Sequence, residues 1–157
     1  MADIISDGKT SVVWMLTCAT QTAPTAAELS AGVDLETWIT PDGLDIQSTV
    51  TNVDTSALSS TQDSEVPGRK KDQLTLTFKH QGDSEVPWTT FASRPDGFIC
   101  IRYGVDSTTA YTTASQVDLY PIRCGDRMRM ASAPNEVLKF QVNMYVSGDV
   151  QQSVTLS

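Results

Sequence analysis

Residues 137–146 read VLKFQVNMYV, and apolar side chains alternate with polar ones along the stretch. Successive side chains of an extended chain point to opposite faces. The apolar side chains therefore share one face: Leu138, Phe140, Val142, Met144 and Val146. This period of two predicts a half-buried β-strand.

Similar patterns mark further strand candidates on the N-terminal and C-terminal sides of this stretch. They cover residues 11–16, 33–40, 43–50, 73–79, 97–103, 117–124, 127–130 and 150–156. Turn-forming Asp-Gly and Gly-Asp pairs separate many of them. About nine short strands predict a mainly β protein, an antiparallel β-sandwich or barrel with one or two short flanking helices. The length of 157 residues suits one domain spanning residues 1–157.

Two short segments carry helix signals. Thr25 and Glu28 stand three residues apart as a capping box, and Gly32 is expected to end this first helix in the left-handed conformation. In the second segment, residues 84–95, Ser84 is expected to cap the first backbone amides. Both helices are too short to form a layer of their own, so we expect them to flank the sheet.

A long polar connection separates the strand candidates that end near Thr51 and begin near Gln73. Residues 52–72 are rich in Ser, Thr and Asp and contain the basic run Arg69-Lys70-Lys71. Loops longer than about 12–15 residues without secondary structure are uncommon inside compact domains, and those that occur are usually functional or disordered. We therefore expect this loop, more than any other segment of the chain, to contact a partner.

Charge is divided unevenly along the chain. The formal net charge is -8; residues 1–68 hold ten acids and one base, whereas residues 69–157 hold nine acids and ten bases. Such a chain repels phosphates over much of its surface, and tight nucleic-acid binding needs clustered Lys and Arg. The composition therefore argues against a protein that holds nucleic acid tightly, although repulsion of DNA can itself be a function.

Side chains for catalysis or metal binding are scarce. The single histidine, His80, is expected at the exposed end of a strand, and we interpret it as a solvated or structurally satisfied side chain. Cys18, Cys100 and Cys124 have neither metal nor redox spacing and are interpreted as buried thiols. We therefore expect no enzyme, no metal site and no cofactor.

The N-terminal residues give no indication of export or membrane insertion. Acidic side chains stand where a secretory signal needs positive charge, and the apolar run Val12–Leu16 is too short to cross a bilayer. From these residues we expect a protein that stays in the cytoplasm after synthesis and has no membrane partner.

Three stretches together resemble a known family. They are PTAAELSAGVDLETWITPDGLDI (24–46), a long loop closing on Pro67-Gly68 before QLTLTFKH (73–80), and NEVLKFQVNMYVSGDVQQSVTL (135–156). In order and spacing they resemble the tail tube (major tail) proteins of long-tailed, non-contractile (siphovirus-type) bacteriophages, particularly those of actinobacterial hosts. The resemblance covers nearly the whole chain.

The resemblance implies a structural virion protein whose subunits assemble as hexameric rings. The rings would stack into a hollow tail tube through which double-stranded DNA passes without sequence recognition. Implied partners are other copies of the chain, the tape measure protein, the tail terminator and the distal tail protein. The implied location is the virion tail, assembled in the host cell cytoplasm. The alternative from the residues themselves is a monomeric β-sandwich binding module, such as a virion decoration or receptor-binding domain.

A tube lumen must let DNA slide without sticking, which acidic and small polar side chains favour. The strand faces opposite the core supply such groups, and we expect them to line the lumen: Asp34, Glu36, Asp45, Gln47, Thr49, Thr75, Thr77, Gln141 and Asn143. Lys79 and Lys139 lie on the same faces and count against a purely acidic wall. The competing interpretation is that these are ordinary solvated faces.

The resemblance also assigns the long loop to contacts with the neighbouring ring. Its charged residues are candidates for this contact: Asp54, Asp63, Glu65, Arg69, Lys70 and Lys71. A flexible, merely solvated loop is the competing interpretation. Two nearly charge-free segments, residues 12–16 and 154–156, are expected to pair with neighbouring subunits, with burial in the monomer's own sheet as the alternative.

Overall fold

The computed structural model describes residues 1–157 and holds eight strands and two short helices. In chain order they are β1 (Thr10–Met15), α1 (Ala26–Ala31), β2 (Val33–Asp34), β3 (Ile39–Asp54), β4 (Glu65–Lys79), α2 (Val86–Thr90), β5 (Asp96–Tyr103), β6 (Gln116–Arg129), β7 (Lys139–Val146) and β8 (Gln151–Thr155). Every strand pairing is antiparallel. The mainly β class expected from the sequence is confirmed, with the two short helices.

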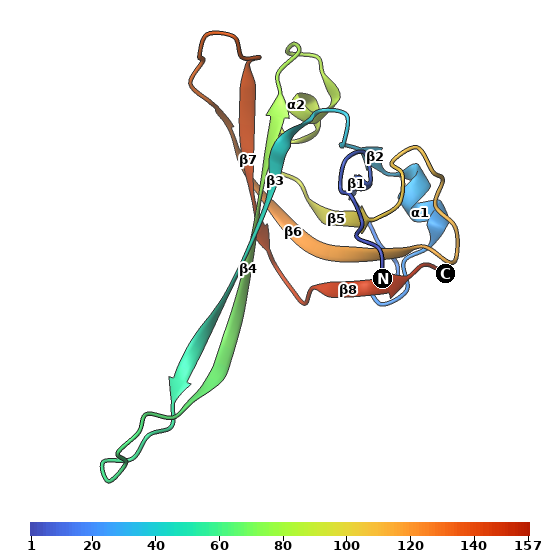
Figure 1. Ribbon diagram of the computed structural model, residues 1–157. Helices are drawn as coiled ribbons and strands as arrows, with labels where there is room; N and C mark the ends of the chain where they lie inside the picture. Colours follow the sequence, from blue (N-terminus) through green and yellow to red (C-terminus); the bar gives the residue numbers. More distant parts are fainter.

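All eight strands belong to one sheet, which folds over on itself (Figure 1). Its order is β2-β1-β5-β6-β7-β4-β3, and β8 pairs with the first part of β6 while β7 pairs with the second part. The register of β6 against β7 shifts between Cys124 and Arg127. Such a bulge bends a strand, so β6 runs from the layer of β5 and β8 into the layer of β7 and β4. The two layers are therefore parts of a single sheet.

Three of the expected strands differ in extent from the observed ones. Residues 117–124 and 127–130 were predicted as separate strands, but they form the one strand β6, interrupted only by the bulge. Residues 33–40 were predicted as a single strand, but a turn occupies residues 36–38 between β2 and the start of β3. The Gly125-Asp126 pair suggested a turn between two strands, but it lies at the bulge within β6.

The main core lies between the two layers of the folded sheet. Fully buried members on β1, β4, β5, β6 and β7 and just after α2 include Trp14, Leu74, Leu76, Phe78, Phe91, Ile99, Ile101, Ile122, Phe140, Val142 and Met144. The predicted inward faces of residues 73–79 and 140–144 are thereby confirmed. Leu138 and Val50, also predicted to face inward, are about half exposed, since β7 begins only after Leu138 and Val50 lies beyond the body.

A second, smaller core lies on the other face of β1, β5 and β6. Helix α1 covers this face and inserts Leu29, which is fully buried. Val13, Cys100 and Leu119 supply the sheet side of the contact, and Leu156 closes it after β8. The strands β1, β5 and β6 are therefore buried on both faces.

The helix caps follow the sequence only in part. The capping box is present, with Glu28 N–H donating to Thr25 Oγ1 (3.1 Å) and Thr25 N–H donating to a Glu28 carboxylate oxygen (2.9 Å). Gly32 is not left-handed, since its φ is -73°; a Cβ there would lie 2.5 Å from Val13 Cγ1, so close packing requires the glycine. Ser84 does not cap α2, because the N-cap is Glu85 and no side chain bonds the first amides.

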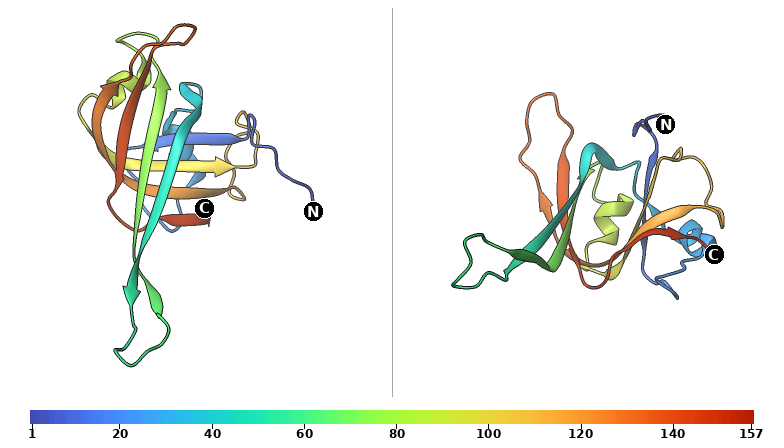
Figure 2. Two further views of the ribbon diagram at one scale, coloured as in Figure 1. Left: turned by 60° about the vertical axis from the view of Figure 1, so that its left-hand side comes forward. Right: turned by 60° about the horizontal axis from the view of Figure 1, so that its bottom comes forward.

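A long β-hairpin leaves the body, as Figures 1 and 2 show. Strands β3 and β4 stay paired as far as Asp54 and Glu65, so residues 52–72, predicted as a structureless loop, are mostly strand. Only residues 55–64 form the connecting loop. The prediction failed because this part of the hairpin buries no face and so lacks the alternation that identified the other strands.

The two segments expected to pair with neighbouring subunits lie mainly in the monomer's own sheet. Strand β1 pairs with β5 along its length and with β2 near its end, and Val12 to Met15 are buried. Leu156 is buried as well, although one edge of β8 has no partner strand. Neither helix has the length and apolarity of a membrane span.

Candidate functional site

Strands β3, β4 and β7 present one continuous polar face on the side away from the core. Asp45 of β3 lies opposite Thr75 of β4, and Thr75 lies opposite Asn143 of β7. Thr75 Oγ1 donates a hydrogen bond of 3.3 Å to Asn143 Oδ1. Seven of the nine predicted lumen residues share this face: Asp45, Gln47, Thr49, Thr75, Thr77, Gln141 and Asn143.

The other two predicted lumen residues lie elsewhere. Asp34 pairs with Val13 at the opposite edge of the sheet, and Glu36 stands in the turn that follows β2. Glu36 Oε2 is buried and has no hydrogen-bond partner. Burial raises the pKa of this carboxyl above its ordinary value. Asp34 and Glu36 therefore do not extend the polar face, because the turn before β3 takes them away from it.

The polar face is basic at the end where β4 finishes and β7 begins. Lys79, the last residue of β4, lies directly opposite Lys139, the first residue of β7. Lys139 Nζ is 3.9 Å from Glu136 Oε2, whereas Lys79 has no carboxylate within 4 Å. The middle of the face therefore carries small or polar side chains, and two positive charges lie side by side where β4 ends and β7 begins.

The far end of the hairpin is acidic. Asp54, the last residue of β3, lies directly opposite Glu65, the first residue of β4. Neither forms an ion pair; Asn52 Nδ2 donates to Glu65 Oε2 (2.8 Å) and Ser56 N–H donates to Asp54 Oδ1 (2.8 Å). The hydrogen bonds from Ser56 hold the pKa of Asp54 below its ordinary value. Asp63 adds a third exposed acid in the connecting loop.

The predicted basic run lies halfway along the hairpin. Lys70 Nζ is 3.6 Å from Asp72 Oδ1, whereas Arg69 and Lys71 have no carboxylate within 4 Å. A bulge next to this run shifts the register between Val50 and Asn52. All six predicted stacking residues are therefore carried on the hairpin, in an acidic end and a basic middle.

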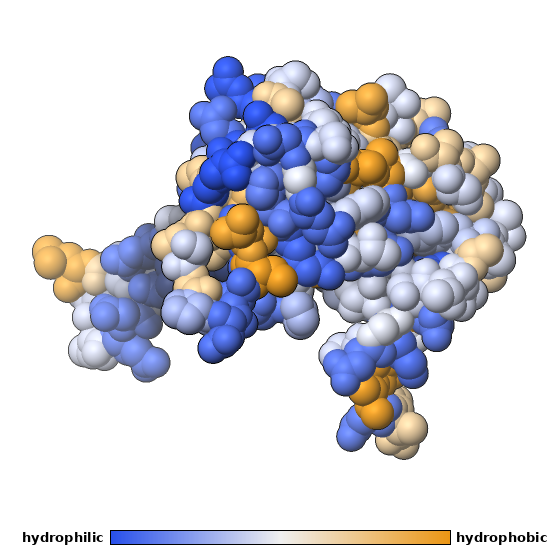
Figure 3. Space-filling model, turned by 90° about the horizontal axis from the view of Figure 1, so that it is seen from above, coloured by the Kyte–Doolittle hydropathy of each residue, from blue (hydrophilic) through white to orange (hydrophobic).

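The hairpin beyond the body has no core of its own. Val50, Val53 and Val66 are each nearly half exposed, and Leu58 in the connecting loop is fully exposed. Figure 3 shows apolar side chains at the ends of two projections, the hairpin and the N-terminal segment that carries Ile4 and Ile5. Exposed apolar side chains on projecting elements are typical of contact surfaces.

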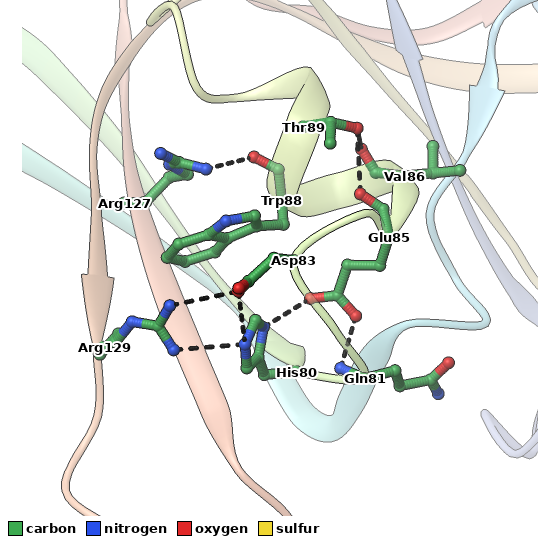
Figure 4. Close-up of polar contacts among 9 residues, drawn as sticks. All are labelled: His80, Gln81, Asp83, Glu85, Val86, Trp88, Thr89, Arg127 and Arg129. Carbon is green, nitrogen blue, oxygen red and sulfur yellow. Dashed lines mark hydrogen bonds and ion pairs between the residues drawn. The ribbon is translucent and has the colours of Figure 1, made fainter.

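His80 lies in a satisfied polar cluster that fastens α2 to the sheet (Figure 4). Its side chain is only 10% exposed, with Nδ1 2.8 Å from Glu85 Oε1 and Nε2 3.2 Å from Arg129 Nη1. The guanidinium groups of Arg127 and Arg129 lie 3.9 and 4.5 Å from the centre of the Trp88 ring. The expected exposed position is wrong, whereas the interpretation as a structurally satisfied histidine fits these contacts.

A buried arginine organises the loop between β5 and β6. Arg102 is 1% exposed, and its guanidinium donates to Ser11 Oγ and to the backbone carbonyl oxygens of Asp106 and Thr109. It also stacks at 4.3 Å from the centre of the Tyr111 ring. The loop is held mainly through its backbone, which gives it a defined shape without apolar burial.

Several of these features are invisible in the sequence. The opposed pairs Asp54/Glu65 and Lys79/Lys139 depend on strand register, and the enclosure of Arg102 depends on how a loop folds back. Alternation already placed Lys79 and Lys139 on the same kind of face, which was the only available signal. No group of three or more His, Cys, Asp and Glu side chains is arranged to hold a metal ion.

Comparisons with known proteins give one family match and similar folds among solved structures. A family model described as phage tail tube protein matches residues 1–157. The cryo-EM structure of the anti-feeding prophage (AFP) baseplate, 6-fold symmetrised, is similar with a TM-score of 0.61 and 10% identity over 96% of each chain. The SPP1 tail tube is similar with a TM-score of 0.61 and 8% identity over 99% of this chain and 81% of that one. No curated protein sequence matches.

Proposed function

This chain belongs to the phage tail tube protein family, and from that premise we propose that its subunits form stacked hexameric rings through which double-stranded DNA passes. A structural role in the tail of a virion follows from the family, which is one of structural proteins rather than enzymes. Beyond this structural role we propose the ring, its sixfold symmetry, the stacking of rings and the passage of DNA. We also propose a non-contractile tail, of the style found in phages of actinobacterial hosts.

The projecting hairpin is the observation that carries the proposal. An isolated two-stranded ribbon is at best marginally stable in water, yet β3 and β4 continue far beyond the last buried residues of the body. A neighbouring subunit would supply the surface that the hairpin lacks. Asp54, Asp63, Glu65, Arg69, Lys70 and Lys71 are the proposed charged contacts of this arm with the next ring.

A closed ring of identical subunits needs contacts between two different patches of the chain. One of the similar solved structures, that of the anti-feeding prophage baseplate, is 6-fold symmetrised, which is the symmetry that we propose here. Tail assembly in the host cytoplasm would add the tape measure protein inside the tube and the tail terminator and distal tail protein at its ends.

The polar face of β3, β4 and β7 is the proposed lumen surface. Thr75, Thr77, Gln141 and Asn143 form its middle and carry neither an aromatic ring nor a positive charge, while Tyr145 and Lys71 lie farther along the same face. Asp45, Gln47 and Thr49 extend it along β3. Asp34 and Glu36 are not part of this proposed surface because they lie at the other edge of the sheet.

Removal of the hairpin tests the proposal. Residues 50–70 are replaced by Asn-Gly, which closes the paired Thr49 and Lys71 through a two-residue turn. We expect a folded protein with nearly unchanged melting temperature, because the deleted residues are exposed, and no tubes by electron microscopy at concentrations where the complete chain forms them. Tubes formed equally well by the truncated protein would contradict the role of the hairpin, and a complete chain that stays monomeric would favour the binding-module alternative.

A further inference from the structure

The two ends of β4 carry like charges that face each other across the sheet. At its first residue, Glu65 lies opposite Asp54; at its last residue, Lys79 lies opposite Lys139. Like charges directly opposite each other destabilise a pair of strands. The acidic pair has no cation within 4 Å, and in the basic pair only Lys139 has a carboxylate near that limit. Both arrangements cost the isolated subunit stability.

These pairs lie at opposite ends of the molecule along the same strand (Figure 1). The acidic pair closes the strands of the hairpin just before the connecting loop, and the basic pair lies where β4 and β7 meet the loops beside α2. A copy displaced along the direction of β4 would bring its acidic pair to the basic pair of the next copy. The charges that repel within one subunit are thus complementary between two.

Apolar side chains accompany both pairs. Leu58 is fully exposed in the loop next to Asp54 and Glu65, while Val137 and Leu138, both more than half exposed, immediately precede Lys139. Exposed apolar groups beside complementary charges are the usual composition of a contact surface, in which the charges set register and partner choice.

We propose that the Lys79–Lys139 end of each subunit is the docking surface for the acidic hairpin end, Asp54 and Glu65, of a second copy in the adjacent ring. This rests on the proposed stacking of rings and specifies which surface receives the hairpin. The contact neutralises both like-charge pairs at once, so it favours head-to-tail stacking and disfavours contact between two hairpin ends or between two lysine ends.

Two double variants test the docking surface. The first is Asp54→Lys with Glu65→Lys, and the second is Lys79→Glu with Lys139→Glu. Each retains a like-charge pair at the altered position, so we expect the melting temperature of the subunit to stay close to that of the original chain. In each variant both ends carry the same sign, so we expect at least a tenfold loss of stacked tubes, measured by sedimentation and electron microscopy.

Mixing the two variants gives the decisive measurement. The hairpin end of each is complementary to the lysine end of the other, so we expect the mixture to form tubes with alternating rings although each variant alone does not. Rescue by mixing cannot arise from misfolding, because two misfolded proteins do not restore each other. Raising the salt concentration should weaken the rescued tubes, since dissolved ions screen exposed charges and the Debye length, about 10 Å at 0.1 M, shortens as salt is added.

A matched control is Asp149→Lys, a charge reversal in the exposed turn before β8, which should assemble like the original chain. Normal tubes from either double variant alone, or no rescue on mixing two folded variants, would overturn the docking surface while leaving the tube function intact. Failure of the original chain to stack under all conditions would instead contradict the proposed function itself.

Discussion

Glu36 is one of three residues with a buried side-chain polar atom that has no hydrogen-bond partner. Its unpartnered atom is Oε2, and burial raises the pKa of the carboxyl above its ordinary value. The folded protein therefore binds this proton more readily than the unfolded chain. The free energy of unfolding should therefore fall as the pH rises from the pKa of Glu36 in the unfolded chain through its higher pKa in the folded protein. Below the pKa of the unfolded chain, Glu36 is protonated in both states and does not lower stability.

Glu36→Gln removes the ionisation. At pH 7 we expect the melting temperature to rise by about 2 °C, the shift that somewhat under 1 kcal/mol causes in a domain of this size. The gain is small because the side chain is only half-buried, and it should shrink toward zero near pH 4. Thermal melts of both proteins from pH 4 to 8 measure it, and a difference that is constant with pH would show that ionisation is not the cause.

Alternation predicts which side of a strand a residue occupies, but not which residue faces it on the next strand. Thr75, Thr77, Gln141 and Asn143 were placed correctly on outward faces because Leu76 and Val142 beside them had to be inside. The same reasoning misplaced Asp34 and Glu36, because a turn between β2 and β3 breaks the strand. Register comes from the whole fold, so the opposition of Lys79 and Lys139 could not be predicted.

The elements differ in how clearly the sequence predicts them. The start of α1 was predictable because a capping box is a local hydrogen-bond pattern between Thr25 and Glu28. The end of α1 was not, since Gly32 is required by contact with the distant Val13 and Trp14 rather than by its own backbone angle. The hairpin was missed because strand pairing without burial leaves no period in the sequence.

Gly68 gives a test of the hairpin as an independent element. A Cβ at this position would lie 2.5 Å from the carbonyl oxygen of Thr51, which is backbone of the partner strand. Gly68→Ala should therefore disturb pairing beyond the bulge without unfolding the body, because no core residue is involved. Hydrogen exchange should become faster at residues 51–54 and 65–68 and stay unchanged in β5 and β6.

Leu29, in the second core, provides a comparison with Gly68. Leu29→Ala leaves a cavity between α1 and the sheet and should destabilise the whole domain by about 2–4 kcal/mol. Chemical denaturation measures this loss. If Gly68→Ala lowered global stability as much as Leu29→Ala, the hairpin would be part of the cooperative body rather than a separate arm.

For the molecule as a whole, the sequence predicted the mainly β class but not the shape. Alternating strands require a β fold with an interior, and their number suits two layers. The folding of one sheet over itself depends on the bulge in β6, and the projection depends on where burial stops along β3 and β4. Neither the bulge in β6 nor the point where burial stops along β3 and β4 can be recognised from the local amino-acid composition.

The shape sets a length for the assembly. A strand rises about 3.3 Å per residue, so the acidic and basic ends of the 15-residue β4 are at most about 46 Å apart. If the hairpin end of one subunit docks on the lysine end of the next, rings should repeat along the tube at about this distance or less, depending on the tilt of β4.

Cryo-electron microscopy of tubes assembled from the purified chain is the strongest test of hairpin-mediated ring stacking. We expect sixfold rings around an open channel wide enough for duplex DNA, an axial repeat of at most about 50 Å allowing for the docking contact, and the β3–β4 hairpin lying against the adjacent ring. Tubes in which the hairpin projects into solvent without touching a neighbouring ring would contradict it.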